Sequence, residues 1–453
     1  MASTAAPSLA PTTMAPTSAP KSLLYWNAAV LGRAGAMALA ANDDIFSAGG
    51  IMGTGNVGGA TLVAPSDGPR AVVTRLTPGL DVVWATAFGG SGYGSGAAGV
   101  AWDGASHIYV TGFFQGNLTT GALAVSGGGF YLAKLDAATG ATVWLRASLT
   151  PSDSEGFSVA ADASGAVVTG YFQRNLTLSA STTLVGNPRR DLYVAKYDPA
   201  GSLLWASGWG ASLDDYGNSV ALDASGDIYV VGIVSNTVTF GTTTLVASAS
   251  GDVLVLKLGG ADGAVRWARV FLGTTGSSTA TDVVLDPSGA SAYVTGFFRG
   301  QFTCDGVTLL SQGTQDMFLL GLDTASNGTV VWASSWGGKS FDSSYGVARN
   351  AGGDRLFLTG TFSKNITIAG TFLEPPPPIT EGIVVVAVDA GTGAATGVQA
   401  FYSSSSTLET AAILVNSKNE TYVSGLYAGN MTWNGTVFTA QGVADAFVGK
   451  TIL

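Results

Sequence analysis

The residues with the clearest chemical potential are acidic side chains in polar segments between short apolar runs. They are Asp153, Glu155, Asp214, Asp215 and Asp342. Carboxylates on loops can accept hydrogen bonds from a sugar or ligate a cation, so we treat these residues as ligand-loop candidates. Two facing carboxylates could also hydrolyse a glycosidic bond. Because no pair stands out and no Asp-x-Asp-x-Asp-Gly loop is present, we predict neither a catalytic residue nor a metal site.

The amino-acid composition excludes several other kinds of functional site. The 453 residues include one histidine, His107, and one cysteine, Cys304, which excludes an intrachain disulfide and a zinc site made of Cys and His. We expect His107 to lie near a surface and Cys304 to be a small buried or half-buried residue. With a net charge of -10, the chain lacks the basic footprint of a nucleic-acid-binding protein. It also has no run of about 18 apolar residues, so we predict no transmembrane helix, and we expect no cofactor.

Sequons for N-glycosylation are the strongest functional signal. They occur at Asn117, Asn175, Asn327, Asn365, Asn419, Asn430 and Asn434. Four of them follow a recurrent Gly by five residues and read Asn-Leu-Thr, Asn-Ile-Thr or Asn-Met-Thr. This pattern predicts covalent glycans on an exported protein. The alternative is that Asn-Leu-Thr is a favoured strand-exit sequence copied by duplication.

Residues 1–20 differ from the rest of the chain. They contain Ala, Pro, Ser and Thr but no charge, with Ala-Pro steps that end at Pro7, Pro11, Pro16 and Pro20. Such a segment favours extended chain and cannot form a core, and it has neither the basic nor the apolar region of a signal peptide. We predict either a disordered tail or an arm that contacts a neighbouring subunit.

The elements that must position these residues repeat along the chain. A Gly recurs at positions 49, 112, 170, 232, 296, 360 and 425, and a Trp recurs at 26, 84, 144, 205, 267 and 332, which gives one unit of about 62 residues. Each unit holds four short β-branched and aromatic runs separated by Asp, Gly and Ser turns, with a longer polar loop after the second. The Asp residues before the first turns, such as Asp103, Asp162, Asp223 and Asp286, should bond to the turn backbone.

Seven such units predict an all-β protein, a seven-bladed β-propeller of four-stranded antiparallel blades over residues 21–453. The last unit ends after its third strand, at residue 453, and residues 22–28 match the fourth strand at 202–206. We therefore expect the N-terminal strand to complete the last blade and close the ring. Most aromatic residues should pack between blades, while Trp209, Trp336 and Trp433 lie nearer strand ends and are expected to be more exposed.

Three segments carry a resemblance to the seven-bladed β-propeller (SBBP) repeat family: residues 223–232, 191–201 and 209–217. The resemblance implies a secreted or cell-surface protein and supplies no shared catalytic residue. Residues 135–144, Leu-Asp-Ala-Ala-Thr-Gly-Ala-Thr-Val-Trp, also resemble the tryptophan-docking repeat of quinoprotein dehydrogenases. In that family Asp caps a turn, Gly supplies a positive φ and Trp packs between blades, so the resemblance implies structural roles for these three residues. Quinoprotein dehydrogenases have eight blades and adjacent cysteines, whereas this chain has seven units and one Cys.

Together these observations predict a non-catalytic extracellular glycoprotein. Its expected role is that of a structural subunit in a surface or filament-like assembly, with self-association through the arm at residues 1–20. One alternative is a lectin-like propeller that binds carbohydrate through several equivalent loop pockets. A third interpretation is a loop-built glycoside hydrolase or lyase with a carboxylate pair at one end of the central channel.

Overall fold

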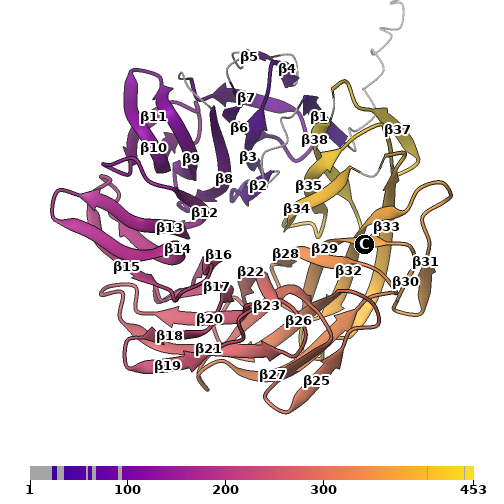
Figure 1. Cartoon of the computed structure of the whole chain (residues 1–453). Coiled ribbons are helices and arrows are strands. Elements are labelled where there is room, and N and C mark those ends of the chain that lie inside the picture. Colours follow the sequence, from indigo (N-terminus) through magenta and orange to yellow (C-terminus); the bar gives the residue numbers. More distant parts are fainter. Residues whose placement is uncertain are drawn as a thin grey trace, which may run out of the picture.

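Short apolar runs and Asp/Gly turns build a ring of small antiparallel sheets (Figure 1). The computed structural model describes residues 23–27, 35–57, 60–63, 68–89, 94–405, 407–442 and 444–453. All regular elements in these ranges are strands, and seven four-stranded blades surround a central axis. The predicted seven-bladed β-propeller is therefore confirmed. None of the residues described forms a helix long and apolar enough to cross a membrane.

Blades 1 to 6 each take their strands in chain order from the axis outward and are complete within one unit. Blade 1 has β2 (Ala36–Leu39), β3 (Ile45–Ile51), β6 (Arg70–Leu76) and β7 (Val82–Ala87). Blade 2 has β8 (Gly94–Trp102), β9 (His107–Thr120), β10 (Leu123–Asp136) and β11 (Thr142–Ala147). Blade 3 has β12 (Ser154–Asp162), β13 (Gly165–Ser179), β14 (Thr182–Tyr197) and β15 (Leu203–Trp209).

Blades 4 to 6 repeat the pattern. Blade 4 has β16 (Tyr216–Leu222), β17 (Ile228–Val234), β20 (Asp252–Leu258) and β21 (Val265–Gly273). Blade 5 has β22 (Thr279–Leu285), β23 (Ser291–Phe298), β26 (Asp316–Asp323) and β27 (Thr329–Trp336). Blade 6 has β28 (Asp342–Arg349), β29 (Arg355–Ser363), β32 (Glu381–Asp389) and β33 (Ala395–Ser403).

Blade 7 joins the two ends of the chain. It consists of β34 (Leu408–Val415), β35 (Thr421–Tyr427), β38 (Asp445–Thr451) and, as its outer strand, β1 (Leu23–Asn27). The predicted closure by the N-terminal strand is confirmed, but its register corrects our alignment. Trp26 lies opposite Ala446, just as Trp209 lies opposite Leu192, so it corresponds to Trp209 and not to the Trp84 series.

The expected polar loop after the second strand is in fact a β-hairpin. In blades 2 and 3, β9–β10 and β13–β14 extend to form it. In the other blades it is a separate pair: β4 (Thr54–Val57) and β5 (Ala60–Val63), β18 (Thr237–Phe240) and β19 (Thr243–Val246), β24 (Gln301–Cys304) and β25 (Val307–Leu310), β30 (Ile366–Ile368) and β31 (Thr371–Leu373), and β36 (Asn430–Trp433) and β37 (Thr436–Thr439). Sequence periodicity missed these strands because their outward positions are mostly Thr and Asn.

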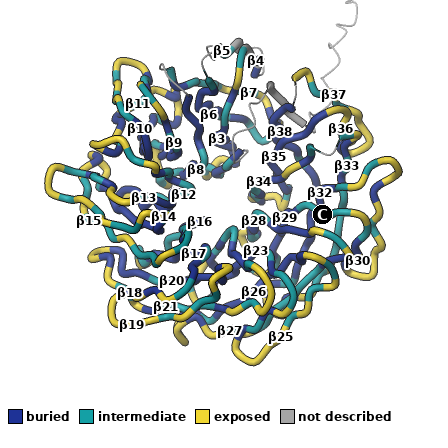
Figure 2. The backbone as a smooth tube through the Cα atoms, in the orientation of Figure 1, coloured by how far each residue is buried: buried dark blue, intermediate teal, exposed yellow. Residues whose placement is uncertain are grey.

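These hairpins tie each blade to the one before it. β24 pairs with the end of β21, and β36 pairs with the end of β33, so two hairpins extend the sheet of the preceding blade. Single backbone bridges join Gly89 to Thr119 and Gly338 to Ile366 in the same way. The inward side of the hairpins is apolar, and it buries Trp433 and Cys304. The expectation for Cys304 is thus confirmed, whereas the expected exposure of Trp433 is wrong. Exposed residues concentrate at the outer rim of the ring (Figure 2).

A tryptophan on the fourth strand docks each of blades 1 to 5 onto the next blade. The indole Nε1 of Trp84 donates to Ala137 O at 3.1 Å, and that of Trp144 donates to Pro199 O at 3.1 Å. Each accepting carbonyl lies in the turn between the third and fourth strands of the next blade. A positive-φ Gly in the same turn lies against the indole; a Cβ at Gly201 would be 2.9 Å from the ring of Trp144. The turns from Gly140 to Gly393 repeat this contact at five junctions.

Two glycines with the same φ of +81° allow backbone strain in the turn to be measured separately from contact with the indole. Gly201→Ala places a methyl group against Trp144, whereas Gly226→Ala meets no atom within 4 Å. We expect Gly226→Ala to cost about 1 kcal/mol from backbone strain and Gly201→Ala to cost roughly 2 kcal/mol more from overpacking. Urea unfolding monitored by tryptophan fluorescence gives both values. Equal losses would show that the indole does not restrict the turn.

Candidate functional site

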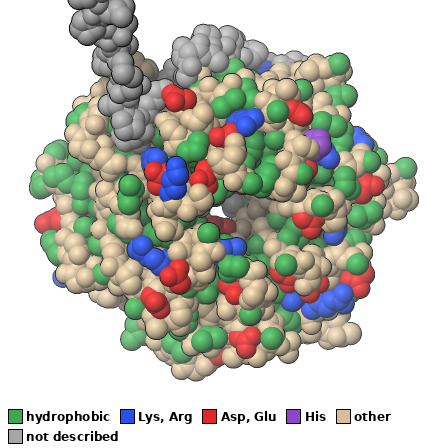
Figure 3. Space-filling model, turned by 180° about the vertical axis from the view of Figure 1, so that it is seen from behind, with side chains coloured by type: hydrophobic (Ala, Val, Ile, Leu, Met, Phe, Trp, Pro, Cys, Tyr) green, Lys and Arg blue, Asp and Glu red, His purple; other side chains and the backbone are tan. Residues whose placement is uncertain are grey.

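The first strands of all seven blades line a central channel with a volume of about 980 Å³. In blades 2 to 7 this strand contains a β-bulge, so one residue is left out of the pairing with the second strand. The extra residues are Ala98, Phe157, Asn218, Thr281, Tyr345 and Ala411, and all of them line the channel. Figure 3 shows the opening of the channel at the middle of one face.

The same bulges account for the recurrent Gly. A Cβ at Gly112 would be 2.0 Å from the carbonyl oxygen of Gly96, and one at Gly170 would be 1.9 Å from that of Glu155. The bulged first strand approaches the second strand too closely for any side chain at this position. In blades 2 to 7, Gly at this position therefore allows one residue of the first strand to bulge toward the channel.

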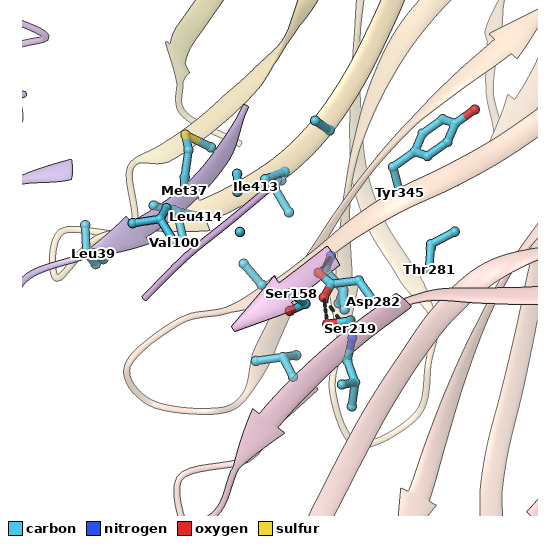
Figure 4. A pocket seen from close by; sticks show the side chains of 18 of the residues that line it. Met37, Leu39, Val100, Ser158, Ser219, Thr281, Asp282, Tyr345, Ile413 and Leu414 are labelled. Carbon is cyan, nitrogen blue, oxygen red and sulfur yellow. Dashed lines mark hydrogen bonds between the residues drawn. The ribbon is translucent and has the colours of Figure 1, made fainter. Parts of the chain in front are cut away.

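The channel wall mixes apolar and polar side chains, some of which Figure 4 labels. Blades 7, 1 and 2 contribute Met37, Leu39, Val100, Ile413 and Leu414, but also the carboxylates of Asp43 and Glu409. Blades 3 to 6 contribute Ser158, Ser219, Thr281, Asp282 and Tyr345, but also Val159, Val220, Val283 and Val347. Polar and apolar residues therefore occur on both sides of the channel.

Asp282 is the carboxylate that blades 3 to 6 contribute to the channel wall. Its Oδ1 accepts hydrogen bonds from the Ser219 hydroxyl at 2.7 Å and from the Val283 N–H at 2.9 Å. Its Oδ2 accepts the Val347 N–H of the next blade at 3.0 Å. One side chain thus links the inner strands of blades 4, 5 and 6. The sequence analysis missed Asp282; the available signal was a Thr-Asp pair within an apolar run, 14 residues before the recurrent Gly296.

Two of the predicted ligand-loop residues are interior structural groups. Asp215 and Asp342 are fully buried, which contradicts the expected position at loop tips. Asp215 accepts the Ala211 and Ser235 N–H groups at 2.8 and 2.6 Å, and Asp342 accepts those of Gly338 and Ser363 at 2.6 and 3.1 Å. Burial raises the pKa of Asp215 to about 7 and that of Asp342 to about 6, although the N–H donors oppose the shift. The loops before the first strands need these carboxylates to satisfy their backbone.

The structure brings two of the other candidates to one place. Tyr171 donates to Asp153 at 3.1 Å, and Tyr216 donates to Asp214 at 3.4 Å. Between the two tyrosines lies Arg190, whose guanidinium carbon is 4.4 Å from the centre of the Tyr171 ring. Burial raises the pKa of Tyr171 and Tyr216, so both hydroxyls stay protonated donors at neutral pH. This cluster fastens blade 3 to blade 4.

Glu155 is half-buried at the start of β12, where it lies opposite Tyr171 in the neighbouring strand. The candidates therefore do not form one equivalent pocket in each blade. Within the parts of the chain that the structure describes, no group of three or more His, Cys, Asp or Glu side chains could hold a metal ion.

The repeated turn Asp residues have their predicted role. Asp103 accepts the Ala105 N–H at 2.9 Å, and Asp162 accepts the Ser164 N–H at 2.7 Å. Asp223 and Asp286 make the same kind of contact with Ser225 and Ser291. His107 is half-exposed, with its Nδ1 3.2 Å from the Asp103 carboxylate.

Six of the seven sequon asparagines are exposed, and Asn365 is half-buried. Asn117, Asn175, Asn365 and Asn430 occupy the start of the hairpin in blades 2, 3, 6 and 7. Asn434 lies at a hairpin tip, and Asn327 and Asn419 lie in turns with positive φ. The arm with Pro7, Pro11, Pro16 and Pro20 lies outside the described residues.

Comparisons with known proteins show no family for this chain. No protein-family model matches the chain. No curated protein matches it either. Among solved structures, the Cps50 (Swd1) β-propeller domain of Myceliophteria thermophila shares 9% identity with a TM-score of 0.47, over 93% of this chain and 98% of that one. BamB from Moraxella catarrhalis shares 13% identity with a TM-score of 0.37, over 85% and 92% of the two chains. Quinohemoprotein alcohol dehydrogenase from Comamonas testosteroni shares 12% with a TM-score of 0.41, over 95% and 76%.

The buried carboxylate of Asp215 should make the free energy of unfolding depend on pH, and burial determines the direction of the change. Between about pH 4 and pH 7 the unfolded chain has lost the Asp215 proton while the native state retains it, so this group's contribution to stability falls as pH rises. Asp215→Asn removes the titration and one acceptor. We therefore expect the variant's loss in unfolding free energy to be larger at pH 5 than at pH 8 by roughly 2 kcal/mol.

Urea unfolding at the two pH values provides this difference. Asp262→Asn makes the same charge change at an exposed position and serves as the control; the Ala264 N–H lowers the pKa of Asp262, so it stays ionised at both pH values and the variant should show no such difference. A loss for Asp215→Asn that is the same at pH 5 and pH 8 would contradict the assignment.

Proposed function

We propose that this protein is a non-catalytic extracellular glycoprotein that serves as a structural subunit of a surface or filament-like assembly. The observation that carries the proposal is the equivalent placement of four sequons. In the hairpins of blades 2, 3, 6 and 7, the residue after Asn is buried: Leu118, Leu176, Ile366 and Met431. Strand alternation therefore directs the Asn and the Thr of each sequon away from the core.

The chemistry of the rim supports self-association. The outward positions of the hairpins in blades 4 and 5 are Thr237, Thr239, Thr244, Val246, Gln301, Thr303, Thr308 and Leu310, with no charge among them. Val246 is 66% exposed and Leu310 is 65% exposed. Exposed, uncharged strands invite pairing with another chain. These two hairpins also lack sequons; the sequon of this arc is Asn327, in the turn between β26 and β27.

Non-catalytic use is supported by how the candidate carboxylates are used. The carboxylate oxygens of Asp215 and Asp342 accept hydrogen bonds from backbone N–H groups. Those of Asp153 and Asp214 accept hydrogen bonds from tyrosine hydroxyls. The lectin-like alternative needs equivalent pockets in several blades, whereas only Asp153 and Asp214 among these residues come together, in one cluster between blades 3 and 4. We also infer that the repeats belong to the SBBP family, on the strength of residues 223–232, 191–201 and 209–217.

Glycosylation is tested at one exposed sequon with a matched pair of variants. Thr432→Ala abolishes the acceptor sequence at Asn430, whereas Thr432→Ser preserves it. For protein secreted by eukaryotic cells, we expect the intact mass of Thr432→Ala to fall by one glycan and that of Thr432→Ser to match the wild type. The wild-type mass should also fall after enzymatic removal of N-glycans. An unchanged mass after that treatment would contradict the proposal that the protein carries N-glycans.

Assembly is tested by two independent changes. Removing residues 1–20 should leave a folded ring, because the ring is closed by β1, but should abolish particles seen by electron microscopy. The double variant Val246→Glu, Leu310→Glu should have the same effect through charge repulsion at the rim. Val185→Glu, at the equivalent exposed position on blade 3, is the control and should assemble normally. Unchanged particles in both test variants would rule out this mode of assembly.

A further inference from the structure

We propose that strand β25 pairs edge to edge with β25 of a second copy of this chain, about a two-fold axis. The inference rests on the proposed self-association and names the contact through which two subunits meet. It concerns the short strand Val307–Leu310, which lies at the outer rim of the ring in Figure 1.

β25 is the free edge of a large sheet. The sheet of blade 4 has the order β16-β17-β20-β21-β24-β25, so among the described strands β25 pairs only with β24. Cys304 and Val307 flank the two-residue turn of this hairpin and form a hydrogen-bonded pair, after which non-hydrogen-bonded and hydrogen-bonded pairs alternate. The N–H and C=O groups of Thr308 and Leu310 therefore point away from β24, toward solvent.

Other hairpin edges have features that oppose pairing with a second chain. Charge and Pro at an edge are such features, and a glycan adds bulk. In blade 6, β31 is followed by Glu374 and by four prolines at 375–378. The hairpins of blades 2, 3 and 7 contain sequons. Strand Val307–Leu310 contains no charge, no Pro and no sequon, so its edge is open to pairing.

β19 of blade 4 is also uncharged, but it is a poorer template. It belongs to a two-stranded sheet with β18, and a hairpin of two strands is marginally stable by itself. β24, in contrast, pairs with the end of β21, where Leu272 lies opposite Thr303. The six-stranded sheet of blade 4 therefore holds β25 in an extended conformation before a partner arrives.

A second β25 presents the matching set of groups. When the two-fold axis passes through Leu309, Thr308 of each copy lies opposite Leu310 of the other, and each pair exchanges both of its N–H···O=C bonds. Such a contact is isologous, because the same strand serves both copies. The arm at residues 1–20 fits this edge less well, since its prolines have no N–H to donate to a ladder.

The side chains at this edge also favour a second copy, although the chain has a net charge of -10. Val307 is 38% exposed, Leu310 is 65% exposed, and Thr308 is exposed between them. The one charged residue of the hairpin, Asp305, forms an ion pair with Arg269 of β21. Pairing therefore removes apolar surface from water and brings no unpaired charge of the hairpin into the contact.

Disulfide trapping in the full chain tests the register. The double variant Thr308→Cys, Leu310→Cys places thiols opposite each other across the axis, at a Cα separation of about 5.5 Å that a disulfide can span. We expect mild oxidation to give a covalent dimer on a non-reducing gel, with or without removal of N-glycans. Each single variant should remain monomeric, because its two thiols are offset by two residues. Burial raises the pKa of Cys304 to about 11, so the native thiol should not react.

A proline substitution tests the backbone bonds without cysteine. Thr308→Pro removes an N–H that points away from β24, so the hairpin keeps its own ladder while the contact loses a donor. Sedimentation at concentrations below those that give particles should show a dimer for the wild type and a monomer for Thr308→Pro. Val437→Pro, at the equivalent position of β37, is the matched control and should sediment as the wild type does.

The outcomes separate this contact from the wider assembly. Pairing through β25 would be overturned by the absence of a trapped dimer, by equal trapping in the single variants, by trapping only after N-glycan removal, or by a dimer that persists in Thr308→Pro. Each of these results would count against β25 even where the wild type forms particles. A trapped dimer in a protein that forms no larger particles would support the contact and contradict the proposed assembly.

Discussion

The docking of one blade onto the next by a tryptophan is the interaction on which the ring depends. All five indole rings lie on a Gly in the turn of the following blade, and in four of the five the indole Nε1 also donates to a carbonyl of that turn. The turn must then carry Gly for two reasons, a positive φ and the absence of a Cβ. At the junction of blades 6 and 7 the tryptophan position is Gly397, which lies next to Leu453. There the C-terminus of the chain replaces the indole, at the blade that β1 also closes.

The hairpins provide a second ring outside the first. Each lies against the outer strand of the preceding blade, so it covers an edge that would otherwise expose unpaired backbone groups. Trp433 illustrates this packing between a hairpin and the preceding blade. It is a hairpin residue, yet it is fully buried and stacks on Phe401 of blade 6 with ring centres 3.7 Å apart. Two sets of contacts thus join neighbouring blades, one through the turns at one end of the strands and one through the hairpins at the rim.

The repeat length, the blade number and the closure could be predicted because they follow from Gly and Trp positions that the structure uses directly. The hairpins were missed although Thr237 to Val246 alternates Thr with Val, Phe and Leu, as a half-buried strand does, because each of the two strands has only four residues. The register of β1 was misjudged because Trp26 and Trp205 both follow Leu-Leu pairs, and only pairing with β38 distinguishes their positions. The burial of Asp215 and Asp342 could not be predicted from the sequence either. An Asp in a solvated loop and an Asp that accepts hydrogen bonds from buried N–H groups have the same sequence context.

The bulge explains why a repetitive fold can carry a site that is not repeated. Backbone pairing, the docking Trp and the turn Asp fix most positions of each blade, and any change there disturbs a neighbour. The bulge residue is different, because it is left out of the ladder and its side chain faces the channel. Phe157, Thr281 and Tyr345 therefore differ from one another without a change in the frame around them. The bulge positions are thus places where one blade can differ chemically from the next while the frame of the ring is kept.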